Sequence, residues 1–268
     1  PQPVKKILLR WNETDPIPHT WRYGADAIGT NISSFDAMDS LVEQILERLP
    51  NIERIIAIGH SAGGQFVHRW ALASNSPVWN NSETTPIRVV AANPRSYAYL
   101  DGRRYNPDGN YYAIPSQDRI NKCPSYNSWE WGLNLEDSRL SAPYVKRAFE
   151  SAGGGLNEIV QQYATRDVRY LIGELDNLPV HAECEDDDFQ GPNRNQRAVR
   201  FFGSLKEVYG QQIHQLVQNM GTPHDHCLLF QSSGAILAMF GESEAVKQFG
   251  MDTKRNEAVK KFQKQNEA

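Results

Sequence analysis

A serine between glycines is the strongest chemical signal in this sequence. Residues 59–63 (Gly-His-Ser-Ala-Gly) have the G-x-S-x-G spacing of a nucleophile on a sharp strand-to-helix turn. The apolar run Arg54–Ile58 predicts a buried strand before the turn, and a helix is predicted after it, to about Ser74. Glycines two residues from the serine avoid collisions with neighbouring backbone. We therefore interpret Ser61 as a nucleophile, rather than a buried serine in a tight turn, and the backbone N–H of Ala62 as an oxyanion donor.

A serine hydroxyl becomes nucleophilic when a histidine removes its proton, and a carboxylate must hold that histidine in the right tautomer. After a turn of this kind the acid comes first along the chain and the histidine second. Asp176 lies just beyond the predicted strand Val168–Ile172, so we predict that Asp176 is the acid. Glu174 is the nearest alternative, and Asp186–Asp188 are more distant ones.

The base is expected in the loop after the last predicted strand, Ile213–Val217. This loop holds His224, which we prefer, and His226, the alternative. The other five histidines are predicted to be structural, and His60 is expected to point away from the reacting side. Joint metal binding by His224, Asp225 and His226 is a minor alternative, so we predict no metal site and no cofactor.

Strands and helices alternate along the chain, which predicts an α/β fold with a mostly parallel sheet and helices on both faces. Cap residues at 31–34 precede a helix predicted over Phe35–Leu49, whose apolar residues recur at spacings of three and four. Further strands are predicted at Lys5–Trp11 and Ile87–Ala92, and the charged segment Glu242–Ala268 is predicted to be a surface helix.

A long irregular segment, about residues 94–162, is rich in Tyr, Trp, Asn, Pro and Gly. Segments of this length inside a compact domain are usually functional, so we predict a lid-like insertion in a single domain of residues 1–268. Its aromatic side chains could line a pocket, and Tyr97, Tyr126 and Trp129 are the predicted substrate-binding residues. The alternative is that these aromatics pack a compact loop.

Several stretches of the chain resemble the α/β-hydrolase fold serine hydrolases, in particular a group of mostly uncharacterised, esterase-like proteins. The resemblance is carried by residues 33–36 (SSFD), 59–65 (GHSAGGQ), 92–97 (ANPRSY), 126–129 (YNSW), 170–176 (YLIGELD) and 190–194 (QGPNR). It implies Ser61, Asp176 and His224 as the catalytic triad and implies no particular substrate.

Composition limits the classes of partner. The 28 basic and 32 acidic residues give a net charge of −4, and no basic stripe suggests nucleic-acid binding. No apolar run has the ~20 residues that a membrane helix needs. Three Asn-x-Ser/Thr sequons, at Asn12, Asn31 and Asn80, favour a secreted glycoprotein over a cytoplasmic protein. We predict a disulfide between Cys123 and Cys184, with Cys227 free.

The predicted reaction is therefore acyl transfer from a small-molecule carboxylic ester to water through an acyl-enzyme on Ser61. An amide or a peptide is the second choice of substrate. The rival class is a catalytically silent binding protein that keeps the hydrolase fold, because fold alone does not determine function.

Only sixty residues precede Ser61, and they hold one predicted strand, one helix and the strand before the turn. In this fold several strands usually precede the nucleophile, and a loop after an early strand supplies the second oxyanion donor. We therefore expect the N-terminal strands to be missing from this chain and an N-terminal fragment of the same precursor to complete the sheet edge. The alternatives are a rearranged sheet or a donor from the Asn12–Gly29 loop.

Overall fold

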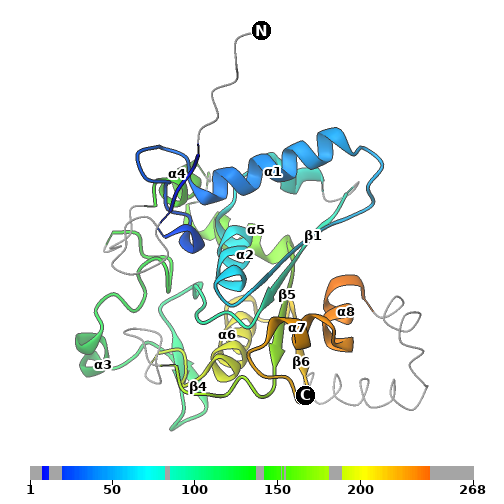
Figure 1. The fold of residues 1–268 in the computed structure, drawn as a ribbon. Coiled ribbons are helices and arrows are strands. Elements are labelled where there is room, and N and C mark those ends of the chain that lie inside the picture. Colours follow the sequence, from blue (N-terminus) through cyan, green and yellow to red (C-terminus); the bar gives the residue numbers. More distant parts are fainter. Residues whose placement is uncertain are drawn as a thin grey trace.

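The main sheet has four parallel strands, in the order β1-β2-β5-β6 (Figure 1). The computed structural model describes residues 8–11, 20–81, 85–136, 142–151, 153, 155–180 and 189–241. The sheet strands are β1 (Ile55–His60), β2 (Ile87–Ala92), β5 (Asp167–Gly173) and β6 (Gln215–Asn219). A separate antiparallel hairpin pairs β3 (Arg104–Asn106) with β4 (Tyr111–Ala113). The α/β class with a parallel sheet is confirmed.

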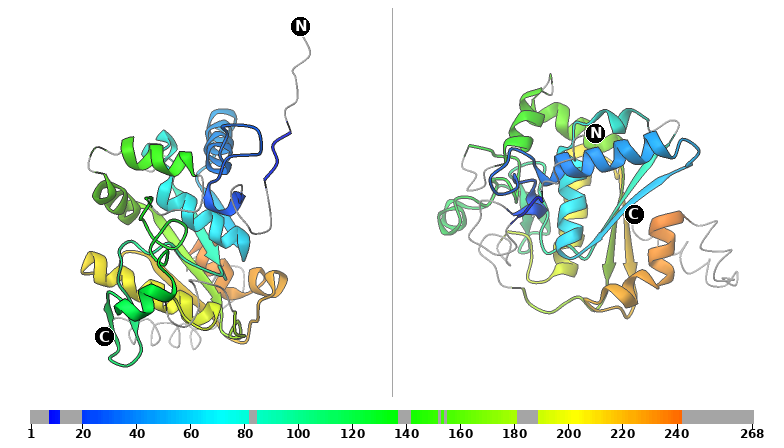
Figure 2. Two further views of the ribbon diagram at one scale, coloured as in Figure 1. Left: turned by 90° about the vertical axis from the view of Figure 1, so that its left-hand side faces the viewer. Right: turned by 45° about the horizontal axis from the view of Figure 1, so that its top comes forward.

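Helices cover both faces of the sheet (Figure 2). The helices are α1 (Ser34–Arg48), α2 (Ala62–Ala73), α3 (Gln117–Lys122), α4 (Pro143–Ser151), α5 (Leu156–Thr165), α6 (Arg194–Tyr209), α7 (His226–Phe230) and α8 (Ser233–Phe240), with short 3-10 helices η1 (Trp21–Tyr23) and η2 (Pro77–Asn81). In the described part of the chain, the sheet therefore lies between two layers of helices.

Alternating strand residues divide the core into two clusters, because successive side chains of a strand point to opposite faces. Val89, Ala91 and Tyr170 belong to the larger cluster, which includes side chains of α2, α4, α5 and α6. Their neighbours Val90 and Leu171 belong to the smaller cluster, together with α7 and α8. The helices on both faces that the sequence predicts are therefore confirmed.

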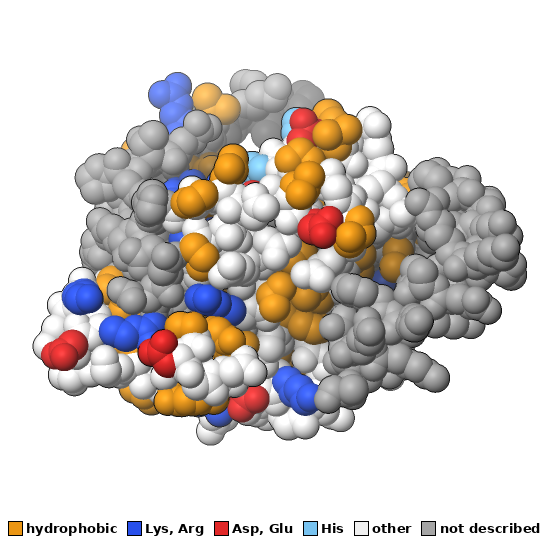
Figure 3. Space-filling model, turned by 90° about the horizontal axis from the view of Figure 1, so that it is seen from below, with side chains coloured by type: hydrophobic (Ala, Val, Ile, Leu, Met, Phe, Trp, Pro, Cys, Tyr) orange, Lys and Arg blue, Asp and Glu red, His pale blue; other side chains and the backbone are white. Residues whose placement is uncertain are grey.

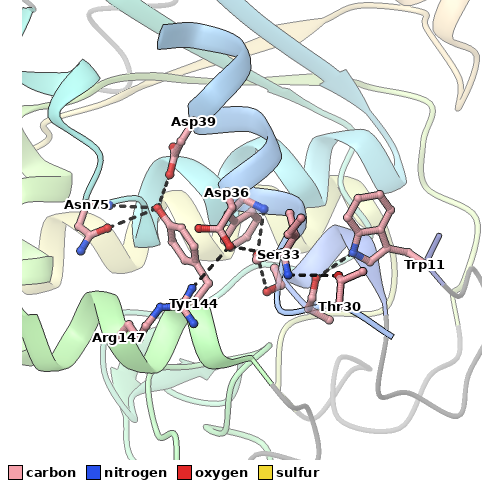
Figure 4. A network of polar contacts seen from close by, with 12 residues as sticks. Trp11, Thr30, Ser33, Asp36, Asp39, Asn75, Tyr144 and Arg147 are labelled. Atoms are coloured by element: carbon pink, nitrogen blue, oxygen red, sulfur yellow. Dashed lines mark hydrogen bonds and ion pairs between the residues drawn. The ribbon is translucent and has the colours of Figure 1, made fainter. Parts of the chain in front are cut away.

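Helix α1 begins with a reciprocal cap. The hydroxyl of Ser33 accepts the N–H of Phe35, and the carboxylate of Asp36 accepts the N–H of Ser33 at 2.8 Å. Asp36 also pairs with Arg147 of α4, and the hydroxyl of Tyr144 donates to Asp39 one turn further along α1 (Figure 4). These contacts attach α4, from the predicted insertion, to a helix near the start of the chain.

The buried carboxylate of Asp39 also joins α1 to α2. It accepts the indole N–H of Trp70 at 2.7 Å and the hydroxyl of Ser74 at 2.8 Å. Burial raises the pKa of Asp39, and the three donors that point at it oppose that rise. Helix α2, which follows the predicted nucleophile, is in this way fixed at its far end.

Two strand predictions need correction. The segment Lys5–Trp11 is not a strand over its described part, Leu8–Trp11, because those residues bond to a loop instead. The carbonyl of Arg10 accepts the N–H of Ile28 at 2.8 Å, and the indole of Trp11 donates to the carbonyl of Ala25 at 2.9 Å. The last strand pairs two residues later than predicted, over β6 rather than 213–217.

The insertion is more regular than the sequence indicates. Its described residues include the β3–β4 hairpin and the helices α3, α4 and α5. The segment Glu242–Ala268, predicted as a helix, lies outside the described residues. No helix in the described parts of the chain is both long and apolar enough to cross a membrane.

Candidate active site

Ser61 occupies the turn between β1 and α2 with a strained backbone. Its φ of 55° and ψ of −112° lie where non-glycine residues are rarely found. Its N–H donates to the carbonyl of Ala92, at the end of the neighbouring strand β2, over 2.9 Å. Such strain persists only where the surrounding structure fixes the residue, and here the bond to β2 contributes to that.

The turn depends on two glycines, and one of them is not the glycine that the motif suggests. A Cβ atom on Gly59 would lie 2.2 Å from the carbonyl oxygen of Gly63. A Cβ atom on Gly64 would lie 2.6 Å from the carbonyl oxygen of Ala92, whereas one on Gly63 would meet nothing within 4 Å. Close approach of α2 to β2 therefore requires Gly64, and the steric role predicted for Gly63 is wrong.

The three predicted triad residues lie in one hydrogen-bonded series. The Nε2 atom of His224 is 3.0 Å from the hydroxyl of Ser61, and its Nδ1 atom is 2.7 Å from a carboxylate oxygen of Asp176. Asp176 is only 2% exposed, while the His224 side chain is 30% exposed at the surface. The structure thus brings together a hydroxyl, an accessible imidazole and a buried carboxylate.

Backbone bonds hold the loop with the acid against the loop with the histidine. The N–H of Glu174 donates to the carbonyl of Asn219 at 2.9 Å, and the N–H of Leu175 donates to the carbonyl of Thr222 at 3.0 Å. The side chain of Glu174, the alternative acid, accepts the N–H of Gly221 instead of approaching the imidazole. The distance between Asp176 and His224 is therefore set largely by main-chain contacts.

Asn93 connects the nucleophile side of the site to the acid side. It follows β2, is fully buried and has a φ of 43°. Its N–H donates to the carbonyl of Leu171, and its side-chain oxygen accepts the N–H of Gly173, both at 2.9 Å. Sequence reasoning missed this residue, although a polar side chain directly after a parallel strand is the same signal that identified Asp176.

Arg194, at the start of α6, is a second residue that the sequence analysis did not assign. Its guanidinium lies 3.5 Å from the carboxylate oxygen of Asp176 that does not contact His224. The backbone N–H of the next residue, Asn195, donates to the carbonyl of Asp176. The carboxylate of Asp176 therefore lies between an imidazole and a guanidinium, and each of them contacts a different oxygen.

His60 does not point away from the site, contrary to the prediction. Its ring centre lies 4.6 Å from that of His224 and 6.0 Å from that of His226. Burial, followed by the two neighbouring histidines, lowers the pKa of His60 to about 4. His60 is therefore neutral near pH 7 and forms a packing surface for the His224 ring.

The predicted substrate-binding aromatics are buried in the protein. Tyr97 is fully buried and stacks on Phe201 at 4.6 Å, and the indole of Trp129 donates to a backbone carbonyl at 2.9 Å. Tyr126 stacks on Phe189, and its hydroxyl donates to the carbonyl of residue 102. These contacts favour the alternative interpretation, in which the aromatics pack a compact loop.

Exposed apolar side chains lie instead on the loops that carry the acid and the histidine. Leu175 is 47% exposed, Leu178 73% and Met220 71%. Leu228, on α7, is 56% exposed. Figure 3 views the molecule from the end where the strands of Figure 1 point, and it shows hydrophobic side chains beside exposed histidine surface. These side chains make part of the surface of the two loops apolar.

The predicted oxyanion donor, Ala62, is the first residue of α2, so the helix offers no internal partner for its N–H. The described end of the Asn12–Gly29 loop lies beside this helix, since Trp21 packs on Phe66 at 5.6 Å between ring centres. A second donor from that loop, or from an N-terminal fragment, stays a prediction.

No protein family model matches the chain, and no curated protein matches it. Six solved chains are similar to it. One is LpqC, a poly(3-hydroxybutyrate) depolymerase from Bordetella parapertussis, at 20% identity and a TM-score of 0.47, covering 85% of this chain and 67% of that chain. Another is a monoacylglycerol lipase from Paleococcus ferrophilus, at 17% identity and a TM-score of 0.30, covering 82% of this chain and 78% of that chain.

Proposed function

We propose that this protein is a serine hydrolase that cleaves carboxylic esters. The observation that carries the proposal is the continuous series from the Ser61 hydroxyl through His224 to Asp176, built on a strained turn at the start of α2. A tight turn with a structural serine would not require an accessible imidazole at hydrogen-bond distance from the hydroxyl. The chain order Ser, acid, His, with the three residues after β1, β5 and β6, is that of the α/β-hydrolase fold.

In the proposed reaction the Ser61 oxygen attacks the ester carbonyl carbon while His224 takes the serine proton. The negative charge of the tetrahedral intermediate is stabilised by the N–H of Ala62 at the helix start. His224 then donates its proton to the leaving alkoxide, which leaves an acyl group on Ser61. Water, deprotonated by His224, attacks the acyl carbon, and the acid product departs as the serine recovers its proton. Asp176 holds the imidazole in place and stabilises its charged form.

The surroundings of the triad support an ester with an apolar acyl or alcohol group. Leu175, Leu178 and Met220 are exposed on the loops that carry the acid and the histidine. Burial of such side chains against a substrate would contribute ~25 cal/mol per Å² of apolar surface. An amide remains the second candidate because it undergoes the same attack, but its amine leaves only when protonated. A silent binding protein would not need the strain stored at Ser61.

A matched pair of histidine variants tests the proposal. We expect His224→Ala to lower kcat on p-nitrophenyl esters by at least ~10³-fold, because the proton acceptor is lost. His226→Ala should cost much less, since its ring lies beside His60 rather than at the Ser61 hydroxyl. The reverse order would refute the assignment of the base.

Ser61→Ala should abolish both ester hydrolysis and labelling by a fluorophosphonate probe, with an unchanged circular dichroism spectrum. If the natural chain reacts with no ester of any chain length and takes up no probe, the silent binding protein is the correct alternative.

A further inference from the structure

Three potential metal ligands lie in sequence directly after the proposed base. They are Asp225, His226 and Cys227, and their ligand atoms all lie within 4.8 Å of one another. Asp225 caps α7, and the other two residues form its first turn. We propose that these three side chains bind a divalent cation of the borderline-soft kind, with Zn²⁺ as the reference ion.

The separation of the sulfur and the imidazole nitrogen fits one shared ion. Sγ of Cys227 is 3.4 Å from Nε2 of His226. In tetrahedral zinc sites, bonds of ~2.3 Å to sulfur and ~2.0–2.1 Å to nitrogen place the two ligand atoms ~3.6 Å apart. The observed distance is close to this value, so both atoms could coordinate one ion after only a small movement of the side chains.

The carboxylate completes the set without losing its structural role. One oxygen of Asp225 accepts the N–H of Leu228 at 2.9 Å, which leaves the second oxygen for an ion. The backbone on both sides is fixed, because the N–H of Asp225 donates to the carbonyl of Pro223 at 2.8 Å and its carbonyl accepts the N–H of Leu229 at 3.0 Å. The ligands therefore project from a short ordered segment.

Ligand chemistry and access select the class of ion. A thiolate and an imidazole favour zinc and related transition metals over magnesium and calcium, which prefer oxygen ligands. The thiolate and the carboxylate together balance a double positive charge. His226 and Cys227 are exposed, so an ion can enter directly from solvent, and water can fill the fourth position.

Zinc binding to the full chain tests the site without any measurement of ester hydrolysis, so the result is independent of the proposed function. The protein is first reduced and treated with a chelator, and Zn²⁺ is then titrated against a competing chromophoric indicator. We expect the natural chain to bind one more equivalent of Zn²⁺ than Cys227→Ser binds, or to bind Zn²⁺ at least ~10-fold more tightly than this variant does. Zinc should also raise the Tm of the natural chain, because an ion that binds the folded state stabilises it.

Two further variants separate ligation from structure. Asp225→Asn keeps a side-chain oxygen to cap α7 but removes the charge, so it should weaken zinc binding while the Tm without metal stays the same. Asp108→Asn, an exposed change in the β3–β4 turn, should bind zinc as the natural chain does. The proposal is overturned if the natural chain binds no zinc under these conditions, or if Cys227→Ser and His226→Gln bind it as tightly as the natural chain.

Discussion

His60 and His224 are neighbouring imidazoles with different surroundings. The His224 ring is exposed and bonded on both nitrogens, whereas the Nε2 atom of His60 is buried and has no hydrogen-bond partner among the described residues. A charge on His60 would be poorly solvated and would lie against the ring of His224, the base in the proposed reaction. Burial therefore keeps the imidazole of His60 uncharged near pH 7.

We expect His60 to titrate near pH 4 in the folded protein, because burial disfavours its charged form. A titration of ¹⁵N-histidine-labelled protein by NMR should show this, with the signal identified by its loss in His60→Gln. A midpoint near pH 6.5 for that signal would contradict the packing described for His60.

At the scale of elements, the contact between α2 and β2 can be tested with two adjacent glycines. Gly64→Ala should destabilise the fold by ~1–3 kcal/mol, because the added methyl group meets the carbonyl of Ala92. Gly63→Ala should leave stability equal or raise it by up to ~1 kcal/mol, since its methyl group meets open space and alanine favours a helix. Urea unfolding of both variants measures the difference, and equal losses would mean that α2 does not approach β2 this closely.

The predicted disulfide between Cys123 and Cys184 would join two elements, the insertion and the loop after Asp176. Cys123 is buried, Cys227 is free and exposed as predicted, and Cys184 lies outside the described residues, so the bond stays a prediction. Thiol titration of unreduced, unfolded protein should find one free thiol. Three free thiols would remove the predicted bond and weaken the case for secretion.

The elements that the sequence predicts well are those with strong local patterns. Strand β2 has the predicted bounds, and α1 begins and ends one residue earlier than predicted. An apolar run and a capped amphipathic stretch are visible in the residues themselves. Ser61, Asp176 and His224 could be proposed for a similar reason, since Ser61 directly follows β1 and the other two lie in the loops after β5 and β6. Tyr97 could not be placed, because its burial depends on Phe201, about a hundred residues later in the chain.

At the scale of the whole molecule, a buried polar series links α2, α5, β5 and the residue before β6. The Nε2 atom of His68 accepts the N–H of Ala98, so its Nδ1–H donates to the hydroxyl of Tyr163. That hydroxyl lies 2.7 Å from the hydroxyl of Tyr170, which in turn donates to Nδ1 of His214 at 3.1 Å. Nε2 of His214 donates to a backbone carbonyl. His68 must be neutral because its Nε2 accepts a backbone N–H, and burial favours the neutral form of His214.

This series predicts acid sensitivity of the fold. Burial lowers the pKa of His68 well below its usual value and that of His214 to about 4. Between pH 6.5 and 4 the unfolded chain binds protons at both sites and the folded chain does not, so stability is full above pH 6.5 and falls as the pH drops. For His214 the loss is roughly 3 kcal/mol.

Urea unfolding at a series of pH values measures this loss. In His214→Gln the fall in stability between pH 6.5 and 4 should be smaller than in the natural chain, although the variant is less stable at pH 7. An equal fall in both proteins would show that His214 is charged in the folded state.

Apart from the contact between Asp176 and His224 themselves, the described bonds between their loops come from main-chain N–H and carbonyl groups and from the side chain of Glu174. Peptide groups are common to nearly all amino acids, so exchange of Leu175, Leu178 or Met220 leaves these bonds in place. If the protein acts as proposed, substitution of these apolar side chains can change the range of esters that it accepts without changing the spacing of Ser61, His224 and Asp176. Replacement of Leu178 by residues of graded size should change KM across a series of ester chain lengths while kcat for the shortest ester stays nearly constant.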